Sequence, residues 1–303
     1  MIIYSQYNEG IYMKIGIAYH KDISNWTTAE LIKAIKDEGE EPVPFQVQEV
    51  TADIPDNFSI GKQLEPLNDL NAIILRTYGF GTTDQLTYRI SLFEHLENAG
   101  IPVINSTHAF RKAKDKYAAL FTLSKAGIPV PKTRVTENLD AAIEFLDHVK
   151  SVIIKPLLGS RGYGIIKTDN KDLAYRALKF IFSLGQVLYL QEYIEKPDRD
   201  IRAFVIGDEV IGAMYRYSTN WKTNVSQGAK PVGCKLSEEL EEIAIKSAHA
   251  IGLDYTGIDI IEGKDGPYVI ETNAAPSWHG LEEAIGENVS RKIIRYVRAK
   301  ARK

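Results

Sequence analysis

Cysteine is almost absent from this sequence: Cys234 is the only one among 303 residues. A single thiol cannot form an internal disulfide or a multi-thiolate zinc site, which excludes a disulfide-stapled scaffold and a structural zinc domain. The sequence therefore predicts a protein of a reducing compartment, and we expect it in the cytoplasm.

Long apolar runs are missing as well. No run of about 18 apolar residues is present, so we expect no membrane-spanning helix and no membrane partner. The first residues, MIIYSQYNEGIY, lack a basic start and an unbroken apolar segment, unlike a secretory signal. A strand-like run begins only at Met13, and we expect residues 1–12 to be an N-terminal extension.

An excess of charge of either sign is also missing. Lysine and arginine number 37 against 40 aspartates and glutamates, a formal net charge of −3. General nucleic-acid binders carry a basic excess, so we expect no nucleic-acid partner. With 44% hydrophobic and 25% charged residues, the chain has the composition of an ordinary globular protein, with length for about two domains.

Apolar runs alternate with helical spacing along the first third of the chain. Strands are predicted over residues 13–19, 42–47, 71–75 and 102–104, and helices over residues 27–39 and 88–98 between them. This order is typical of parallel βαβ units, so we predict an α/β fold. A dinucleotide-binding domain is the alternative, but no G-x-G-x-x-G follows the first strand, which argues against dinucleotide chemistry.

The remaining two thirds mix strands and helices in another order. A predicted helix over residues 113–125 ends at Gly127, with Pro129 and Pro131 beyond it, and we expect the hinge after the first domain there. Helices are predicted over residues 173–184 and 240–251. Strands are predicted over residues 151–155, 164–167, 187–193, 201–206, 210–215, 255–261 and 268–272.

Three side chains with oxygen atoms gather on the hairpin predicted at residues 255–272. Glu271 and Asn273 are two apart on one strand, so they face the same way. If the hairpin is centred on Asp265, Asp259 lies directly opposite Glu271, where two carboxylates repel each other unless a cation lies between them. Oxygen ligands suit Mg²⁺ or Mn²⁺ and not zinc. The alternative is an exposed hairpin whose acids face water.

A glycine-rich segment follows the strand that ends at Lys155. It contains Gly159, Ser160, Gly162 and Gly164. Backbone N–H groups of such a segment can approach a phosphate closely, and the lysine adds a positive charge. The Walker pattern is excluded because no G-K-[ST] closes the loop. The alternative is an ordinary turn between two strands.

The segment Gln191-Glu192-Tyr193-Ile194 ends another predicted strand, and Asp200-Ile201-Arg202 follows it. Backbone groups at such a strand end can pair with the edge of an adenine, and Asp200 can accept a hydrogen bond from a ribose hydroxyl. A core strand that runs into a polar loop is the alternative.

Arg216 and the segment Asn220–Asn224 bring donors and an aromatic ring, Trp221, into one predicted loop. Such a group suits a ligand that carries a carboxylate or a phosphate. A solvated loop is the alternative.

Taken in order, these motifs resemble those of the ATP-grasp carboxylate–amine ligases, in the RimK-like branch that includes the ribosomal-protein S6 glutamate ligase. The most specific pieces are Asp200-Ile201-Arg202, Gly257-Ile258-Asp259 and Glu271-Thr272-Asn273-Ala274-Ala275-Pro276. The resemblance begins at Met13 and implies an ATP-grasp fold in three parts. These are an N-terminal parallel βαβ domain (13–111), a central subdomain with a glycine-rich lid (112–190) and a C-terminal subdomain with a metal site (191–303).

The resemblance also implies how ATP is bound. The phosphates would contact Lys116, Lys155 and the lid residues Gly159, Ser160, Gly162 and Gly164. Adenine would contact Glu192, Tyr193 and Ile194, and the ribose would contact Asp200. A further part of the nucleotide would contact Lys222, Thr223 and Asn224. Lys222 stands where the S6-modifying relative has arginine, so the two-pronged contact of a guanidinium is lost.

For catalysis, the resemblance implies two Mg²⁺ or Mn²⁺ ions bound by Asp259, Glu271 and Asn273. Lys155 and Arg202 would neutralise the transferring phosphoryl group. The implied reaction joins an amine to a carboxylate through an acyl phosphate.

The residues after the metal motif differ from those of the S6-modifying branch, because Trp278 follows closely. There the sequence looks closest to ligases that add α-linked L-glutamate to tetrahydromethanopterin or to a deazaflavin coenzyme. The implied partners are L-glutamate and a carboxylate-bearing small molecule, which Arg216 and Trp278 would contact, the latter by stacking. Packing of Trp278 beneath the loop is the alternative.

Three matters stay open from the sequence. The acceptor could instead be a protein or an amino-group carrier protein, and the chain could be a non-catalytic ATP-binding regulator, although the complete set of Lys155 and three metal ligands argues against the latter. A homo-oligomer also stays open.

The last 13 residues hold seven basic side chains, which predicts a docked helix with a solvated basic face or a docking site for an acidic protein.

Overall fold

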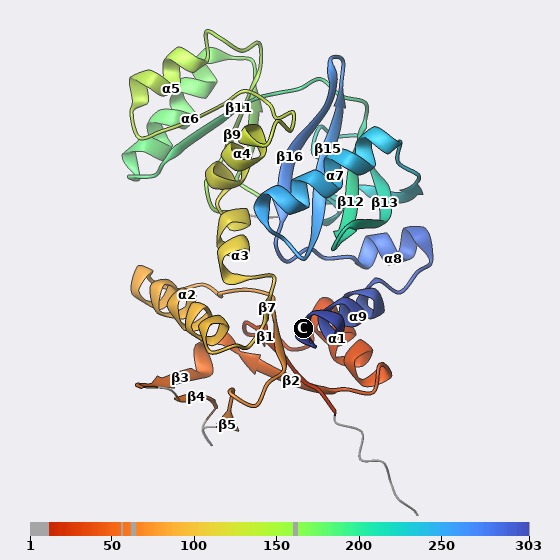
Figure 1. Ribbon diagram of the computed structural model, residues 1–303. Helices are drawn as coiled ribbons and strands as arrows, with labels where there is room; N and C mark the ends of the chain where they lie inside the picture. Colours follow the sequence, from red (N-terminus) through yellow and green to blue (C-terminus); the bar gives the residue numbers. More distant parts are fainter. Residues whose placement is uncertain (1–11, 56, 62–64, 160–162, 303) are drawn as a thin grey trace, which may run out of the picture. The chain divides into compact units, whose positions relative to one another are not determined.

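The computed structural model describes residues 12–55, 57–61, 65–159 and 163–302 (Figure 1). Most of the predicted extension, residues 1–11, lies outside the described residues, and so do Ser160 and Gly162 of the glycine-rich segment. The chain divides into two compact units, residues 1–107 with 290–303 and residues 108–289.

A parallel sheet forms the centre of the first unit, as the alternating pattern predicted. Its order is β2 (Glu41–Gln46), β1 (Lys14–Tyr19), β6 (Ala72–Leu75) and β7 (Val103–Ile104). The connecting helices are α1 (Trp26–Asp37) and α2 (Thr83–Asn98). Each begins at a polar side chain, Asn25 or Thr82, that accepts a hydrogen bond from the first turn of the helix.

A second, smaller sheet in this unit was not predicted. It consists of β3 (Val50–Asp53), β4 (Asn57–Ile60) and β5 (Glu65–Pro66), after the short 3₁₀ helix η1 (Val47–Glu49). Its antiparallel strands are only two to four residues long, too short to produce a clear alternation of apolar and polar residues.

The last helix, α9 (Val289–Ala301), belongs to the first unit from Ser290 onward, although the sequence assigned it to the C-terminal subdomain. Ile293, Ile294 and Val297 are fully buried along one face. A docked helix is therefore confirmed, but its basic face is not simply solvated. Three of its arginines form ion pairs with Glu38, at the end of α1.

The second unit begins in a helical region that the sequence predicted as one helix from residue 113 to 125. The structure has two helices, α3 (Thr107–Lys114) and α4 (Lys116–Lys125). Between them, Asp115 accepts hydrogen bonds from the N–H groups of Tyr117 and Ala118, which starts a new helix. Lys116 is consequently the first residue of α4.

Two antiparallel sheets follow. The first has the order β10 (Ile166–Thr168), β9 (Val152–Lys155), β11 (Leu188–Glu192), β8 (Thr133–Thr136), with α5 (Leu139–Phe145) and α6 (Lys171–Ser183) packed on it through buried residues such as Phe145, Leu178 and Leu190. The order of the second is β14 (Lys230–Cys234), β13 (Glu209–Tyr217), β12 (Arg199–Ile206), β15 (Tyr255–Gly263), β16 (Gly266–Asn273). It packs against α7 (Glu238–Ile251) and α8 (His279–Ile285), and the 3₁₀ helix η2 (Val225–Gln227) precedes β14. The mixed helices and sheets and the parallel sheet near the N-terminus agree with the predicted fold class.

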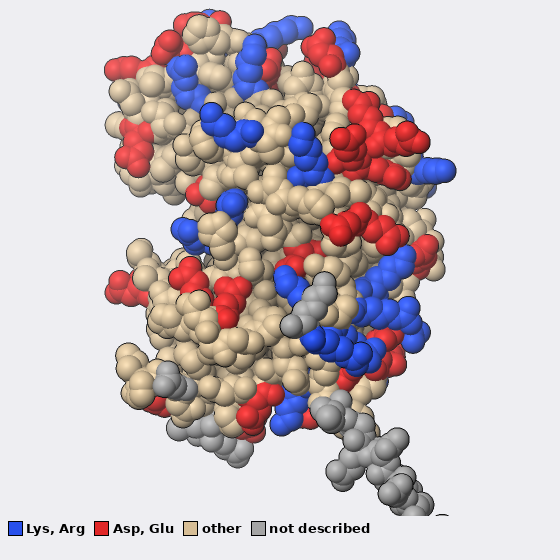
Figure 2. Space-filling view, in the orientation of Figure 1, with Lys and Arg blue, Asp and Glu red and all other residues tan. Residues whose placement is uncertain are grey.

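The surface carries charges of both signs. On the face drawn in Figure 2, basic and acidic side chains lie interspersed, and neither sign covers it. None of the helices in the described part of the chain is long and apolar enough to cross a membrane.

Candidate active site

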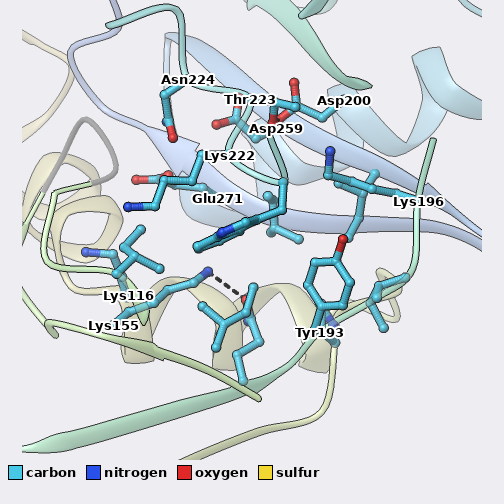
Figure 3. A pocket seen from close by; sticks show the side chains of 18 of the residues that line it. Lys116, Lys155, Tyr193, Lys196, Asp200, Lys222, Thr223, Asn224, Asp259 and Glu271 are labelled. Carbon is cyan, nitrogen blue, oxygen red and sulfur yellow. Dashed lines mark hydrogen bonds between the residues drawn. The ribbon is translucent and has the colours of Figure 1, made fainter. Parts of the chain in front are cut away.

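A pocket lies in the second unit. It gathers residues from both sheets, from α4 and from the loop before η2, and Figure 3 shows it from close by. Thirteen of the residues predicted to form the site line it: Lys116, Lys155, Gly159, Glu192, Tyr193, Ile194, Asp200, Arg216, Lys222, Thr223, Asn224, Asp259 and Glu271. Residues up to 155 positions apart in the sequence, from Lys116 to Glu271, thus meet in one place.

Positive side chains gather at one end of the pocket. Figure 3 shows the ends of Lys116, Lys155 and Lys222 on the side where Glu271 lies, whereas Tyr193 and Lys196 lie at the other end. Lys155 ends β9, and its Nζ donates to Oε1 of Gln191 at 2.7 Å. This end of the pocket is suited to a polyanion.

Two of the three lysines at this end, Lys155 and Lys116, lose part of their preference for the charged form. Burial lowers the pKa of Lys155 to about 8, against the opposing effect of the Glu271 carboxylate. Burial also lowers the pKa of Lys116, whose Nζ donates to the carbonyl oxygens of Leu157 and Gly159 at 3.2 and 3.0 Å. Lys116 thereby holds the start of the glycine-rich segment.

The acidic pair Asp259 and Glu271 faces across the β15–β16 hairpin, as predicted, but for a different reason. The hairpin turns at Lys264 and Asp265, between the paired Gly263 and Gly266. Regular pairing from that turn would place residue 270 opposite Asp259. A bulge at this point lets Glu271 take the place, and both Ile270 and Glu271 line the pocket.

Two arginines engage the Asp259 carboxylate, which is buried. Arg202 lies directly opposite on β12 and donates through Nε to Oδ1 and through Nη2 to Oδ2, the latter at 3.1 Å. Arg216 Nη2 lies 3.2 Å from Oδ2 of the same group. Burial alone would raise the pKa of Asp259, but Arg202 and Arg216 hold it below its ordinary value.

Arg216 also binds a second acid, Asp200, which is its direct partner across β12 and β13. Its Nε and Nη2 donate to the two carboxylate oxygens at 2.7 and 2.6 Å, and the hydroxyl of Thr223 donates to Asp200 as well. Despite burial, the two carboxylates raise the pKa of Arg216. These contacts define what we call the site network: Asp200, Arg202, Arg216 and Asp259.

The site network depends on a glycine. Arg202 passes so close to Gly257 that a Cβ there would lie 2.7 Å from Nη1 and 2.8 Å from Cδ of the arginine. Any larger side chain at this position would push Arg202 away from Asp259. Gly257, part of the Gly257-Ile258-Asp259 motif, therefore makes room for the arginine.

The donor set fits a hard divalent cation. Asp259 and Glu271 offer carboxylate oxygens from neighbouring strands, and Asn273 donates through Nδ2 to the carbonyl oxygen of Gly257 at 3.0 Å, which leaves its own amide oxygen as an acceptor. Among the described residues, no group of three histidines, cysteines or acids could hold a metal. Oxygen ligands of this kind favour Mg²⁺ or Mn²⁺.

The other end of the pocket follows the strand end at β11. The N–H groups of Glu192 and Tyr193 donate to the carbonyl oxygens of Lys132 and Ser151 at 2.8 and 2.9 Å, and the Nζ of Lys167 lies 3.5 Å from the centre of the Tyr193 ring. These contacts fix the strand end at the pocket.

Ten of the residues that line the pocket were not assigned to ATP, metal or substrate from the sequence, among them Gln191, Lys196, Trp221 and Ile270, although Gln191 and Trp221 lie within predicted segments. Lys196 donates to the carbonyl oxygen of Arg199 at 3.0 Å, just before Asp200. Each of the four is adjacent to a predicted residue, or within four positions of one, but neighbours on a chain carry no signal of which way they face. Ile270 in particular reaches the pocket only because of the bulge.

Trp278 does not line the pocket, and the prediction that it stacks on a ligand ring is wrong. Its side chain is 0% exposed and packs edge-to-face on Phe204, with the ring centres 6.3 Å apart. It lies just before α8, beneath the loop, which is the packing alternative. Arg216 lines the pocket, but its guanidinium binds Asp200 and Asp259, so its prediction as a substrate contact is not supported.

Three further predicted residues are placed next to the pocket instead of in its wall. Arg202 contacts Asp259, and Asn273 contacts Gly257, two residues before Asp259 on β15. Gly164 has a φ of +71°, a left-handed conformation that favours glycine, which accounts for that residue by the turn alone.

Comparison with known proteins gives a consistent picture. Residues 113–297 match the model of the RimK-like ATP-grasp domain. The tetrahydromethanopterin:alpha-L-glutamate ligase of Methanococcus maripaludis is 34% identical over 93% of this chain and 97% of its own length, and that of Methanosarcina acetivorans is 34% identical over 94% and 98%.

Solved structures show the same fold. The ATP-grasp ligase PsnB in complex with a minimal precursor superimposes with a TM-score of 0.76 at 24% identity, over 95% of this chain and 99% of PsnB. The same ligase with precursor, Mg and ADP gives a TM-score of 0.74 at 23% identity, over 95% and 98%. At this level of identity the likeness concerns the fold.

Proposed function

The chain belongs to the RimK-like ATP-grasp family, and from this premise we propose that it is an ATP-dependent ligase that joins L-glutamate to a carboxylate-bearing small molecule such as tetrahydromethanopterin. One observation supports the reaction class above all: in a single pocket, lysines suited to phosphate groups face a cross-strand pair of carboxylates suited to a divalent cation. The names of the relatives at 34% identity support the choice of glutamate and of the acceptor.

ATP would lie along the length of the pocket. Its base would contact the strand end at Glu192, Tyr193 and Ile194. Because the N–H groups of Glu192 and Tyr193 are engaged within the sheet, the base would use the carbonyl oxygens there or groups of Ile194. The phosphates would then reach Lys116 and Lys155 at the opposite end, and Lys222, Thr223 and Asn224 would border the nucleotide between them.

A divalent cation would be held by Asp259, Glu271 and Asn273, two ions being expected from the family resemblance. When bound, Mg²⁺ or Mn²⁺ neutralises charge on the phosphates and on the phosphoryl group in transfer. A neighbouring fold, PsnB, was solved with Mg and ADP, which supports this pairing of ligands. For Asp259 to turn to a cation, its contacts with Arg202 and Arg216 must loosen, since both occupy its oxygens.

The reaction would proceed in two steps. The acceptor's carboxylate attacks the γ-phosphorus of ATP, the bond to the β-phosphate oxygen breaks, and an acyl phosphate and ADP form. The amine of glutamate then attacks the acyl carbon and displaces inorganic phosphate, which leaves an amide and releases a proton. Lys155 and Arg202 would stabilise the negative charge that spreads over the phosphoryl oxygens.

The alternative acceptor is a peptide or a protein. PsnB binds precursor peptides, but it is only 24% identical to this chain, and the relatives named for a small-molecule acceptor are 34% identical over nearly their whole length. The acceptor screen below separates the two.

The test is a screen for ADP release with L-glutamate and candidate acceptors: tetrahydromethanopterin, a deazaflavin coenzyme and a peptide with an acidic end. Mass spectrometry of the products should show a gain of a glutamyl unit on a small molecule. Glu271→Gln should abolish ligation and leave the fold intact, because it removes a metal ligand without changing size. Unchanged ADP release in this variant would refute the metal assignment, and incorporation of another amino acid would refute glutamate.

A further inference from the structure

Gln191 makes the closest contact with Lys155, and neither the motifs nor the family assignment gives it a role. Its side chain is 2% exposed, on β11 beneath the pocket. Its Oε1 accepts a hydrogen bond from Lys155 Nζ at 2.7 Å, drawn as the dashed line in Figure 3. Its Nε2 donates to Oγ1 of Thr133 at 3.0 Å.

The direction of these hydrogen bonds is fixed from one end. The hydroxyl of Thr133 donates to the carbonyl oxygen of Pro131 at 3.0 Å, which uses its only proton. Toward Gln191, the hydroxyl can therefore only accept, so the NH₂ group of the amide must face Thr133. The amide oxygen must then face Lys155. We call this chain of contacts the Gln191 relay.

The register of the sheet holds the relay in place. Gln191 lies directly opposite Thr133 on β8, and on its other side Lys155 of β9 pairs with Tyr189, two residues earlier on β11. Residues two apart on a strand share a face, so Lys155, Gln191 and Thr133 lie on the same face of three neighbouring strands. Tyr189, 2% exposed, lies with its hydroxyl 3.5 Å from Nε2 of Gln191 and packs beside it.

The hydrogen-bond acceptor that Gln191 presents to Lys155 is an uncharged amide oxygen, and this affects how Lys155 can bind a phosphate. A carboxylate at this position would form an ion pair with the ammonium group and compete with any phosphate for it. An amide oxygen fixes the direction of the ammonium group and leaves its charge uncompensated. The charged groups nearby, Glu271, Asp259 and Lys116, all lie on the pocket side.

We infer that Gln191 is a positioning residue, which through the Gln191 relay aims the charged Lys155 at the phosphates of ATP. This inference rests on the proposed function, because it takes ATP as the ligand of the pocket. In this role Gln191 acts through Lys155 and not on a reacting atom. Its part is to limit where the lysine can point.

The experiment compares the affinity for Mg·ATP with the affinity for adenosine, by titration calorimetry on the full chain, with no acceptor needed. Gln191→Leu should weaken ATP binding by roughly 10- to 100-fold, the range expected when a hydrogen bond to a charged group is lost, and leave adenosine binding unchanged. Gln191→Glu should also weaken ATP binding, because its carboxylate competes for Lys155.

Thr133 provides the matched control. Thr133→Ser keeps the hydroxyl and should bind ATP like the wild type, whereas Thr133→Val keeps the shape, removes the acceptor and should weaken ATP binding selectively. If ATP and adenosine affinities fall in parallel, or if serine and valine at position 133 behave alike, Gln191 is a packing residue and the inference is wrong. Failure of the wild-type chain to bind ATP would overturn the proposed function, and the inference with it.

Discussion

In the first unit, Arg291, Arg295 and Arg298 converge on Glu38, while in the second unit Arg202 and Arg216 converge on Asp259. We call the former the helix clamp and compare it with the site network. The arginines of the helix clamp are 49%, 59% and 25% exposed, so water reaches them. In the site network, no side chain is more than 12% exposed.

The acids of the two clusters differ too. The helix clamp has three arginines for Glu38 and Glu40, with Arg298 Nε 2.7 Å from Glu40, and the carboxylate of Asp37 acts on Arg291 as well. The site network has two arginines for two acids, and the carboxylate of Glu271 lies beside it. A redundant, hydrated cluster of this kind fastens a helix, whereas the buried site network lies beside a third acid, where we propose that a cation binds.

The largest effect is expected from Arg216→Met in the site network. The buried Asp200 and Asp259 would then lie close together without the arginine that bridges them, and the loss of one partner from a buried ion pair costs about 3–5 kcal/mol. Urea unfolding would measure the loss. Mg²⁺ should stabilise this variant more than the wild type, because fewer arginine contacts need to be displaced from Asp259.

Arg202→Met is the matched control for this prediction. Arg216 would still bridge the two acids, so we expect a smaller loss of stability than in Arg216→Met. A loss below about 1 kcal/mol in Arg216→Met would contradict the idea of a tightly balanced buried network. An equal response of variant and wild type to Mg²⁺ would contradict the link to the cation.

A smaller effect is expected from Glu38→Gln in the helix clamp. The amide is nearly the same size but cannot balance the three arginines, and loss of a hydrogen-bonded charge at a partly buried position costs about 1–3 kcal/mol. Mg²⁺ should not restore this loss. As a control, Arg295→Gln should cost less than about 1 kcal/mol, since this exposed side chain is one of three.

The smallest effect on stability is expected from lowering the pH, which protonates Glu38 of the helix clamp. Hydrogen bonds from Arg291 and then Arg295, against the opposing effect of burial, hold the pKa of Glu38 below its ordinary value of 4.5. Because the folded-state pKa is depressed, the stabilisation is complete above about pH 4.5 and is lost as the pH falls through the folded-state pKa. The difference in Tm between wild type and Glu38→Gln should therefore shrink below pH 4.5, and a constant difference down to pH 3 would contradict this.

The sequence predicted which residues belong to the site better than it predicted which of them contact one another. Asp200, Arg202, Arg216 and Asp259 all carried predicted roles, and three of them line the pocket. That Arg202 faces Asp259 and that Asp200 faces Arg216 follows from β12 lying between β13 and β15. This strand order is a long-range property, which the periodicity of a single segment does not contain.

Local patterns also misled where two signals competed. Apolar spacing favoured one helix over residues 113–125, although Asp115 is a good residue to start a helix, and the structure follows the Asp115 signal. For the hairpin, the actual centre lies between Lys264 and Asp265 and not at Asp265, and the bulge restores the expected facing of Asp259 and Glu271. Trp278 illustrates the opposite case, because its proximity to the metal motif along the chain says nothing about exposure.

The position of α9 in the first unit has a consequence for biosynthesis. Residues 1–107 are translated before the second unit, whereas the helix that completes their own unit is translated only after the second unit. At about 5–20 residues per second, the intervening chain of roughly 200 residues takes on the order of 10–40 s to make. Meanwhile Glu38 lacks its arginines, whereas the second unit, continuous in sequence, can fold as soon as it emerges. The first unit is thus the part of a nascent chain that would most need a chaperone.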